Sequence, residues 1–140
     1  MDREALKAQL RAHEGLRLRP YLDVVGVWTA GYGHNLTANG ISLAVAELML
    51  DDDVDVVLAE LAGVPWFAGL SDVRQLAVAD LVFNLGLAGL RSFVRFISAL
   101  KAERYSAAAR ELEDSRWYRQ VGVRGPQIVK MIETGLNAEA

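Results

Sequence analysis

Near its N-terminus the chain alternates polar and apolar residues at helical spacing. Leu6, Leu10 and His13 fall at positions i, i+4 and i+7, which share one face of an α-helix. The pattern predicts a helix over residues 2–13. Gly15 follows it, as glycine often does at helix ends, so Glu14 is expected at the C-terminal edge, where the chain changes direction.

The next stretch is the only part of the chain that has the character of strands and tight turns. Residues 17–21 and 27–32 include β-branched and aromatic side chains, and Gly26 between them fits a hairpin turn. Gly31 lies inside the second run, where glycine weakens a strand, and Gly33 follows directly after it. Such glycines commonly mark the close approach of a ligand or of another backbone.

The remainder of the chain is predicted to be helical, with serine and glycine at the helix ends. Ser42 is a suitable N-cap for a long helix over 43–61, and Ser71 for a helix over 72–85 that Gly86 stops. The other expected segments are a polar turn at 36–40, a loop at 63–69, helices over 92–100 and 106–113, and a last helix from about Pro126 to Thr134 that Gly135 ends.

Composition places the chain among single globular domains. It has 140 residues, 52% of them hydrophobic and 24% charged, and no cysteine. A net charge of −3 argues against a nucleic-acid binder that relies on a basic face. There is no apolar N-terminal region of a Sec signal, and no apolar run approaches the ~20 residues of a membrane span. We therefore expect synthesis in the host cytoplasm and no stable membrane insertion.

Three side chains around the predicted hairpin could act on a glycosidic bond. Asp23 follows Glu14 by nine residues, and Thr29 comes six residues later. Glycoside hydrolysis needs one carboxyl group to protonate the leaving oxygen and another to act on the opposite face of the sugar. Taken singly, each residue has an ordinary explanation: a surface carboxylate at a helix end, a turn former beside Gly26, and a residue of high β-propensity.

The complete series of motifs is more specific than this spacing. In chain order it comprises Glu14-Gly15, Tyr21-x-Asp23, Gly26, Thr29-x-Gly31-Tyr32-Gly33-His34, Asp51-Asp52-Asp53-Val54, Val82-Phe83-Asn84-x-Gly86, Ser92-Phe93, Ser115-Arg116-Trp117-Tyr118, Arg124 and Thr134-Gly135. This series resembles the phage-type lysozymes, the T-even phage family of glycoside hydrolases. The resemblance covers essentially the whole chain.

The resemblance implies an α+β, mostly helical fold with two lobes. Within a single domain over 1–140, a lobe with a small antiparallel sheet would span about 14–42. A connecting helix over about 43–61 would join it to a helical lobe over about 62–140. The N-terminal helix, 2–13, would belong to the helical lobe.

The resemblance also implies cleavage of the β-1,4 bond between N-acetylmuramic acid and N-acetylglucosamine in peptidoglycan. Glu14 would be the general acid, Asp23 the second carboxylate, and Thr29 would help hold the attacking water. The implied substrate-binding residues are Gly33, Asn35, Phe83, Asn84, Phe96 and Glu111, the last two replacing small polar residues of the family. The implied supporting contacts are Arg124 reaching Glu14, and His34 paired with Asp53. No metal or organic cofactor is implied.

Two departures from the family bear on substrate binding. Residues 35–42 are much shorter than the matching region of the longest members, which predicts a more open cleft on that side. The acidic pI, about 5.4, differs from the basic character typical of the family. Because cell walls are often polyanionic, electrostatic steering to the substrate should be weaker here.

The expected protein is thus an endolysin-type muramidase, monomeric, that acts on the cell wall after release by another factor such as a holin. One competing class is a non-catalytic peptidoglycan-binding module of lysozyme fold, against which the presence of Glu14, Asp23 and Thr29 together argues. Another is a lytic transglycosylase, which works with a single carboxylate. A lysis assay distinguishes the muramidase from the binding module, and the mass of the products distinguishes it from the transglycosylase.

Overall fold

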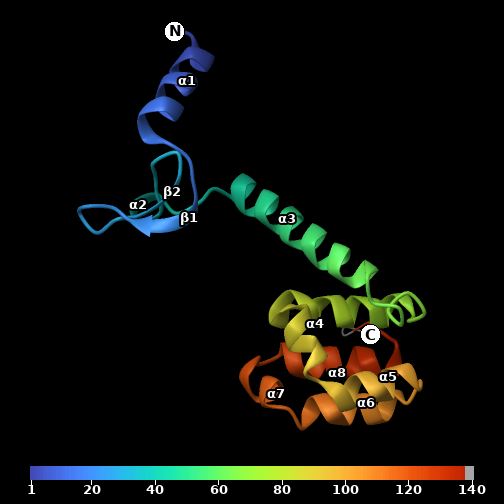
Figure 1. Cartoon of the computed structure of the whole chain (residues 1–140). Coiled ribbons are helices and arrows are strands. Elements are labelled where there is room, and N and C mark those ends of the chain that lie inside the picture. Colours follow the sequence, from blue (N-terminus) through green and yellow to red (C-terminus); the bar gives the residue numbers. More distant parts are fainter. Residues whose placement is uncertain (138–140) are drawn as a thin grey trace. The chain divides into compact units, whose positions relative to one another are not determined.

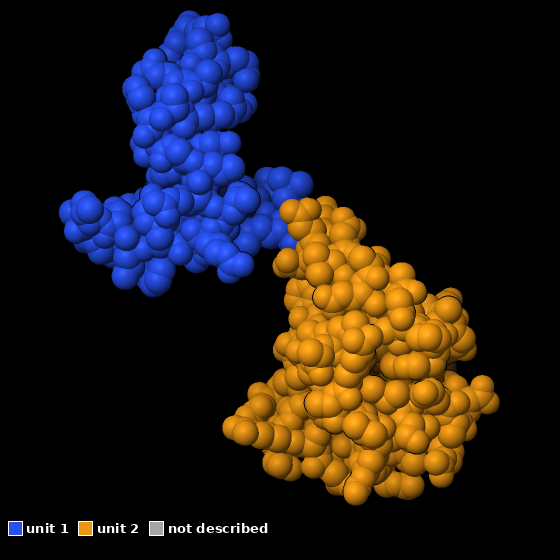
Figure 2. All heavy atoms as spheres, in the orientation of Figure 1, with its two compact units in different colours: residues 1–49 blue, residues 50–140 orange. Residues whose placement is uncertain are grey.

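The computed structural model describes residues 1–137 and divides the chain into two compact units, residues 1–49 and 50–140 (Figures 1 and 2). The first unit contains a three-stranded antiparallel sheet, and the second is built of helices. The predicted α+β, mostly helical fold class is confirmed. The boundary falls inside one continuous helix, α3 (Leu43–Ala62).

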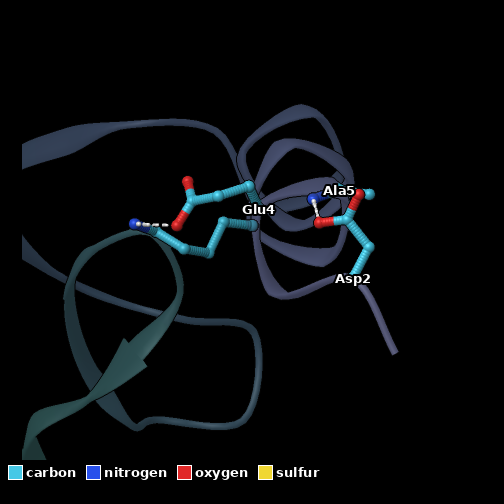
Figure 3. Close-up of polar contacts among 4 residues, drawn as sticks. Asp2, Glu4 and Ala5 are labelled. Atoms are coloured by element: carbon cyan, nitrogen blue, oxygen red, sulfur yellow. Dashed lines mark hydrogen bonds and ion pairs between the residues drawn. The ribbon is translucent and has the colours of Figure 1, made fainter.

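Helix α1 (Arg3–Glu14) begins where the side chain of Asp2 accepts a 3.0 Å hydrogen bond from the backbone N–H of Ala5 (Figure 3). On its first two turns Glu4 pairs with Lys7 at 3.3 Å. The helix ends at Gly15, whose φ of 71° is costly for any residue with a side chain. Both predicted ends are confirmed to within a residue, and Glu14 is the last helical residue.

The apolar face of α1 is only partly covered. Leu6 and Leu10 are 38% and 43% exposed, and no residue of this helix is buried. The contacts of this helix group it with the first unit. Its predicted membership of the helical lobe stays a prediction.

The sheet consists of β1 (Arg17–Leu22), β2 (Trp28–Gly31) and β3 (His34–Asn35), in that order. It confirms the predicted hairpin, with Gly26 at a φ of 82° in the connection between β1 and β2. The register sets Tyr21 opposite Thr29, and Thr29 opposite Asn35. Directly opposite residues project from the same face of a sheet, so these three side chains form one row across it.

The polar turn predicted at 36–40 is wrong: a one-turn helix, α2 (Leu36–Asn39), occupies it. The cause is Asn35, whose Oδ1 accepts a 2.8 Å hydrogen bond from the N–H of Ala38 and so acts as an N-cap. The hydroxyl oxygen of Thr37 accepts a 2.9 Å bond from the N–H of Trp28 and ties α2 to β2.

Helix α3 confirms the predicted long helix and its cap. The Oγ of Ser42 accepts from the N–H of Val45 at 3.2 Å, and the helix runs to Ala62, one residue beyond the predicted end. Only Val57 and Leu61, near its C-terminal end, are buried.

The helical unit continues with α4 (Asp72–Arg91), α5 (Val94–Lys101), α6 (Tyr105–Glu113), α7 (Arg116–Gln120) and α8 (Arg124–Thr134). Ser71 caps α4 as predicted, accepting from Arg74 N–H at 3.4 Å. Gly86 breaks the helix (φ 75°, ψ 160°), but helical backbone resumes to Arg91. The short α7 was not predicted; its cap is Ser115, whose Oγ accepts from the N–H of Tyr118.

The core of the second unit lies where α8 packs against both α4 and α6, and α5 packs against α6 (Figure 1). All of the described apolar residues that are buried fall between positions 57 and 132. Among the described residues, α4 alone is long and apolar enough to cross a membrane by length and composition. That is weak evidence, because the core helix of a globular protein passes the same test.

Arg74 holds α4 to the end of α8. Its Nε donates to Ile132 O at 2.7 Å and its Nη2 to Glu133 O at 3.1 Å. Its guanidinium carbon lies 3.4 Å from the ring centroid of Tyr105, at the start of α6. These carbonyls belong to the last turn of α8, where a helix lacks internal donors, so one side chain joins three helices.

Candidate active site

The carboxylate of Glu14 lies directly against Gly33, in the turn between β2 and β3. A Cβ built on Gly33 would lie 2.5 Å from Oε2 of Glu14 and 2.7 Å from its Cδ. The backbone of Gly33 also has a φ of +67°. The glycine pattern therefore does mark a close approach, but the approaching group is an acidic side chain.

The place of Glu14 on its helix is unfavourable for a negative charge. It is the last residue of α1, where the helix dipole disfavours a carboxylate by roughly 0.3–1 kcal/mol. On the preceding turn, Arg11 lies 5.9 Å from the ring centroid of Tyr32, the residue before Gly33. Helix stability does not account for an acid at this position, whereas a chemical role would.

Asp23 organises the loop between β1 and β2. Its Oδ1 accepts two hydrogen bonds of 2.9 Å, from the N–H groups of Val25 and Val27. Its own N–H donates to Val27 O at 2.9 Å. Asp23 is thus a turn former, as the ordinary explanation has it. Among residues 1–137, however, no hydrogen bond uses its second oxygen, Oδ2, which is left for other chemistry.

Thr29 is the only polar residue buried in the described part of the chain, at 6% exposure. Its hydroxyl donates to Val27 O at 3.0 Å. Because the proton of the hydroxyl is used in this bond, the oxygen is left to accept a hydrogen bond, for example from water. Tyr21 and Asn35 flank Thr29 on the neighbouring strands.

His34 makes a local contact in the first unit. Its Nε2 lies 2.6 Å from Gly40 O, so this nitrogen carries a proton and donates to the carbonyl. Asp53 belongs to the second unit, and the pairing of His34 with Asp53 stays a prediction.

In the second unit, Phe83 and Asp53 line one hollow of about 370 Å³ between α3 and α4. Phe83 is 45% exposed, which leaves part of its ring available to a ligand. The next residue, Asn84, is exposed, and its Oδ1 accepts a 2.8 Å bond from Nε1 of Trp117. This bond fixes the orientation of the amide, because its NH₂ group must point the other way.

Phe96 and Glu111 also share a hollow, of about 310 Å³, next to Ser92 and Arg95. Phe96 is only 1% exposed, so its ring forms the floor of the hollow and offers little surface to a sugar. Glu111 is half-buried at the same hollow. The site contribution of both residues stays a prediction.

Arg124, at the first turn of α8, pairs with Asp80 on α4: its Nε lies 3.1 Å from Oδ1. That oxygen is buried and accepts no well-oriented hydrogen bond from the described residues, so the contact is ionic rather than a good hydrogen bond. The contact of Arg124 with Glu14 stays a prediction.

Sequence reasoning did not select Asp80, Trp117 or Tyr21 for the site. Asp80 precedes Phe83 and Asn84 by three and four residues, the spacing of one helix face, and that spacing could have revealed it. Tyr21 could have followed from the hairpin register. The bond from Trp117 to Asn84 joins residues 33 positions apart, and no local pattern indicates it. No group of three or more residues suited to hold a metal ion occurs within residues 1–137.

In a mostly helical chain with one small sheet, a carboxylate lies against a sheet turn, a second one sits in the hairpin loop, and a hydroxyl is buried on β2. The comparisons with known proteins place the chain in the class of lysozyme-type glycoside hydrolases. The chain belongs to the phage lysozyme family, since the family model described as "Phage lysozyme" matches residues 11–133.

Curated relatives agree with this family. A probable T4-type lysozyme of Dictyostelium discoideum is 24% identical, over 96% of this chain and 97% of its own length. An endolysin of Acyrthosiphon pisum secondary endosymbiont phage 1 is 32% identical, over 73% of this chain and 70% of its own. The pre-baseplate central spike protein Gp5 of Enterobacteria phage T4 is 26% identical over 94% of this chain, which corresponds to 28% of that longer protein.

Proposed function

We propose that this protein is an endolysin-type muramidase that hydrolyses the β-1,4 bond between N-acetylmuramic acid and N-acetylglucosamine in bacterial peptidoglycan. The observation that carries the proposal is the Glu14 carboxylate held against Gly33. A helix end that disfavours an acid and a glycine that makes room for one are together better explained by catalysis than by stability.

Glu14 acts as the general acid and gives its proton to the glycosidic oxygen as the C–O bond breaks. Asp23 acts as the general base through Oδ2, because Oδ1 is engaged by two backbone N–H groups. Thr29 accepts a hydrogen bond from the attacking water, since its own proton is donated to Val27 O. The water loses a proton to Asp23 and its oxygen bonds to the anomeric carbon.

A water held by Thr29 on the face opposite Glu14 leads to an inverted product. Inverting enzymes keep their carboxyl groups about 6.5–9.5 Å apart, and retaining ones about 5–5.5 Å. Asp23 and Glu14 lie on different elements, a hairpin loop and a helix end, which favours the wider separation. Product NMR should show the inverted anomer first, and a retained anomer would make Asp23 a nucleophile instead.

Each unit, taken by itself, offers polar or aromatic groups that suit a glycan. Asn35 lies beside Thr29 in the sheet, although its Oδ1 is already used as the cap of α2. Asn84 presents its NH₂ group, and Phe83 an exposed ring on which a sugar can stack. The proposed partner is peptidoglycan alone, and the protein acts as a monomer on the wall after release from the cytoplasm.

The test is turbidity of a peptidoglycan suspension with wild type and Glu14→Gln. The amide keeps the shape of the side chain and removes the proton, so lysis should fall below detection while the melting curve is unchanged. Glu4→Gln is the matched control, since Glu4 is an exposed acid on the same helix and should keep full activity. Lysis by Glu14→Gln would refute the assignment.

Two alternatives give different outcomes in the same experiment. A binding module without catalysis would clear no turbidity in the wild type. A lytic transglycosylase would clear it but would release anhydro-muropeptides, which mass analysis finds lighter by one water than the hydrolysis products.

A further inference from the structure

Two neighbouring hollows lie on the helical unit, and none of the residues assigned above lines either of them. The first, of about 460 Å³, is lined by the loop after α3 and by α4 and α5: Val64, Pro65, Trp66, Leu87, Leu90, Arg91, Ile97 and Lys101. The second, of about 500 Å³, shares Arg91, Ile97 and Lys101 with it. Volumes of this size are typical of small-molecule sites.

The first hollow is apolar apart from its two cations. Its walls are aliphatic and aromatic, and no carboxylate of residues 1–137 lines either hollow. Trp66 is half-buried in the wall, and Leu90 is fully buried beneath it. The site therefore offers a long side chain or alkyl chain a surface that water covers poorly.

The two cations are shared by both hollows and have no acidic partner in the part of the chain that the structure describes. Arg91 and Lys101 are exposed, and within residues 1–137 neither forms an ion pair or a side-chain hydrogen bond. In a chain with a net charge of −3, two unpaired cations beside a cavity without acids are a local reversal of charge.

From this complementarity we propose that the Arg91–Lys101 hollow binds an amphiphile with a phosphate head and a single alkyl chain. The chain lies along Trp66, Leu87 and Ile97, and the phosphate lies between the two cations. A phosphate suits them because its oxygens can accept from the guanidinium fork and from the ammonium group at once. This binding is separate from glycan cleavage.

A simpler explanation of the cations has to be separated from this one. Arg91 and Lys101 are the last residues of α4 and α5, where a positive charge is favoured by the helix dipole. Arg110 and Arg119 occupy last-turn positions of α6 and α7 in the same way, are also exposed, and line neither hollow. They provide a control matched in charge and place.

The probe is octyl phosphate, followed by the indole N–H resonances of Trp28, Trp66 and Trp117 in NMR spectra of the full chain. The Trp66 resonance should shift and saturate while the other two stay in place. Octan-1-ol and inorganic phosphate, which are the chain and the head alone, should each bind at least about tenfold more weakly.

Arg91→Gln/Lys101→Gln should weaken octyl phosphate binding by about tenfold or more, as the loss of charge-assisted hydrogen bonds predicts, and should leave wall lysis unchanged. Arg110→Gln/Arg119→Gln should bind as wild type. If the first double variant does not fold, Ile97→Glu places a negative charge in the hollows that the two cations line and should also abolish binding. Equal affinity for octan-1-ol, parallel shifts of all three indoles, or unchanged binding by the charge variants would overturn the proposal.

Discussion

Replacing Gly33 with alanine places a methyl group where the Glu14 carboxylate lies. The new carbon would be 2.5 Å from Oε2, and ordinary contact begins at 3.4 Å, so the carboxylate must retreat by about 1 Å. Misplacing a reacting group by about 1 Å can cost roughly 100-fold in rate. Gly33→Ala should therefore reduce lysis by about two orders of magnitude if Glu14 is the general acid.

The cost to stability has a different origin. Glu14 is an exposed, flexible side chain that can move aside at little expense. What remains is the strain of a φ of +67°, which costs an L-residue with a side chain roughly 1–2 kcal/mol. Urea denaturation should show a loss of that size.

Gly31 is a matched control for this strain. Its φ is +68°, but a Cβ there would meet no atom within 4 Å. Gly31→Ala should lose the same stability and keep most of its activity, measured as initial rates of turbidity loss at equal concentrations of folded protein. If the two alanine variants lose activity equally, the contact between Gly33 and Glu14 does not position the acid, and the reasoning fails.

Three further substitutions test the helical unit. Arg74→Met should lower the free energy of unfolding, measured in urea, by about 2–4 kcal/mol, because two hydrogen bonds to carbonyls of α8 and the stacking on Tyr105 are lost. Arg74→Lys should keep only part of this stability. If Arg74→Met is as stable as wild type, Arg74 does not join the three helices. Trp117→Phe should lower the free energy of unfolding by about 1–2 kcal/mol. It should also raise the KM of lysis, because the Asn84 amide loses the hydrogen bond that orients it. An unchanged KM would show that the Asn84 amide does not bind the substrate. Ser71→Ala should lower the free energy of unfolding by about 1 kcal/mol, because it removes the N-cap of α4. Thermal melts measure the loss, and Ser71→Asp, which keeps a capping side chain, is the control.

Helix ends were predictable where one residue determines them. Ser42 and Ser71 cap their helices through their own hydroxyls, and Gly15, Gly86 and Gly135 have positive φ where the helix stops or breaks. Capping and positive φ are local properties of single residues, so the sequence alone predicts them. The α2 and α7 helices were not predicted from the sequence because each is too short to show a hydrophobic period.

The candidate site was predictable as a set of residues and less so as a set of contacts. The pattern of glycines indicated a close approach at Gly33, but that Glu14 makes it depends on how α1 meets the sheet. In the same way, Arg124 was assigned to Glu14 alone, and only the packing of α4 on α8 provides Asp80 as its ionic partner. Contacts between elements distant in sequence follow from tertiary packing, which no local pattern encodes.

The placement of the core has a consequence for hydrogen exchange. Taken by itself, the unit of residues 1–49 buries one residue, Thr29, whereas the buried apolar side chains belong to 57–132. Amide protons exchange when their hydrogen bonds open locally, and opening costs least where few apolar contacts are lost. The amides of β1–β3 should thus exchange with deuterium sooner than those of α4 and α8. Glu14 and Asp23, the two carboxylates of the proposed chemistry, belong to this unit. Pulsed deuterium labelling should therefore show that the part of the molecule that opens first is the part that contains them.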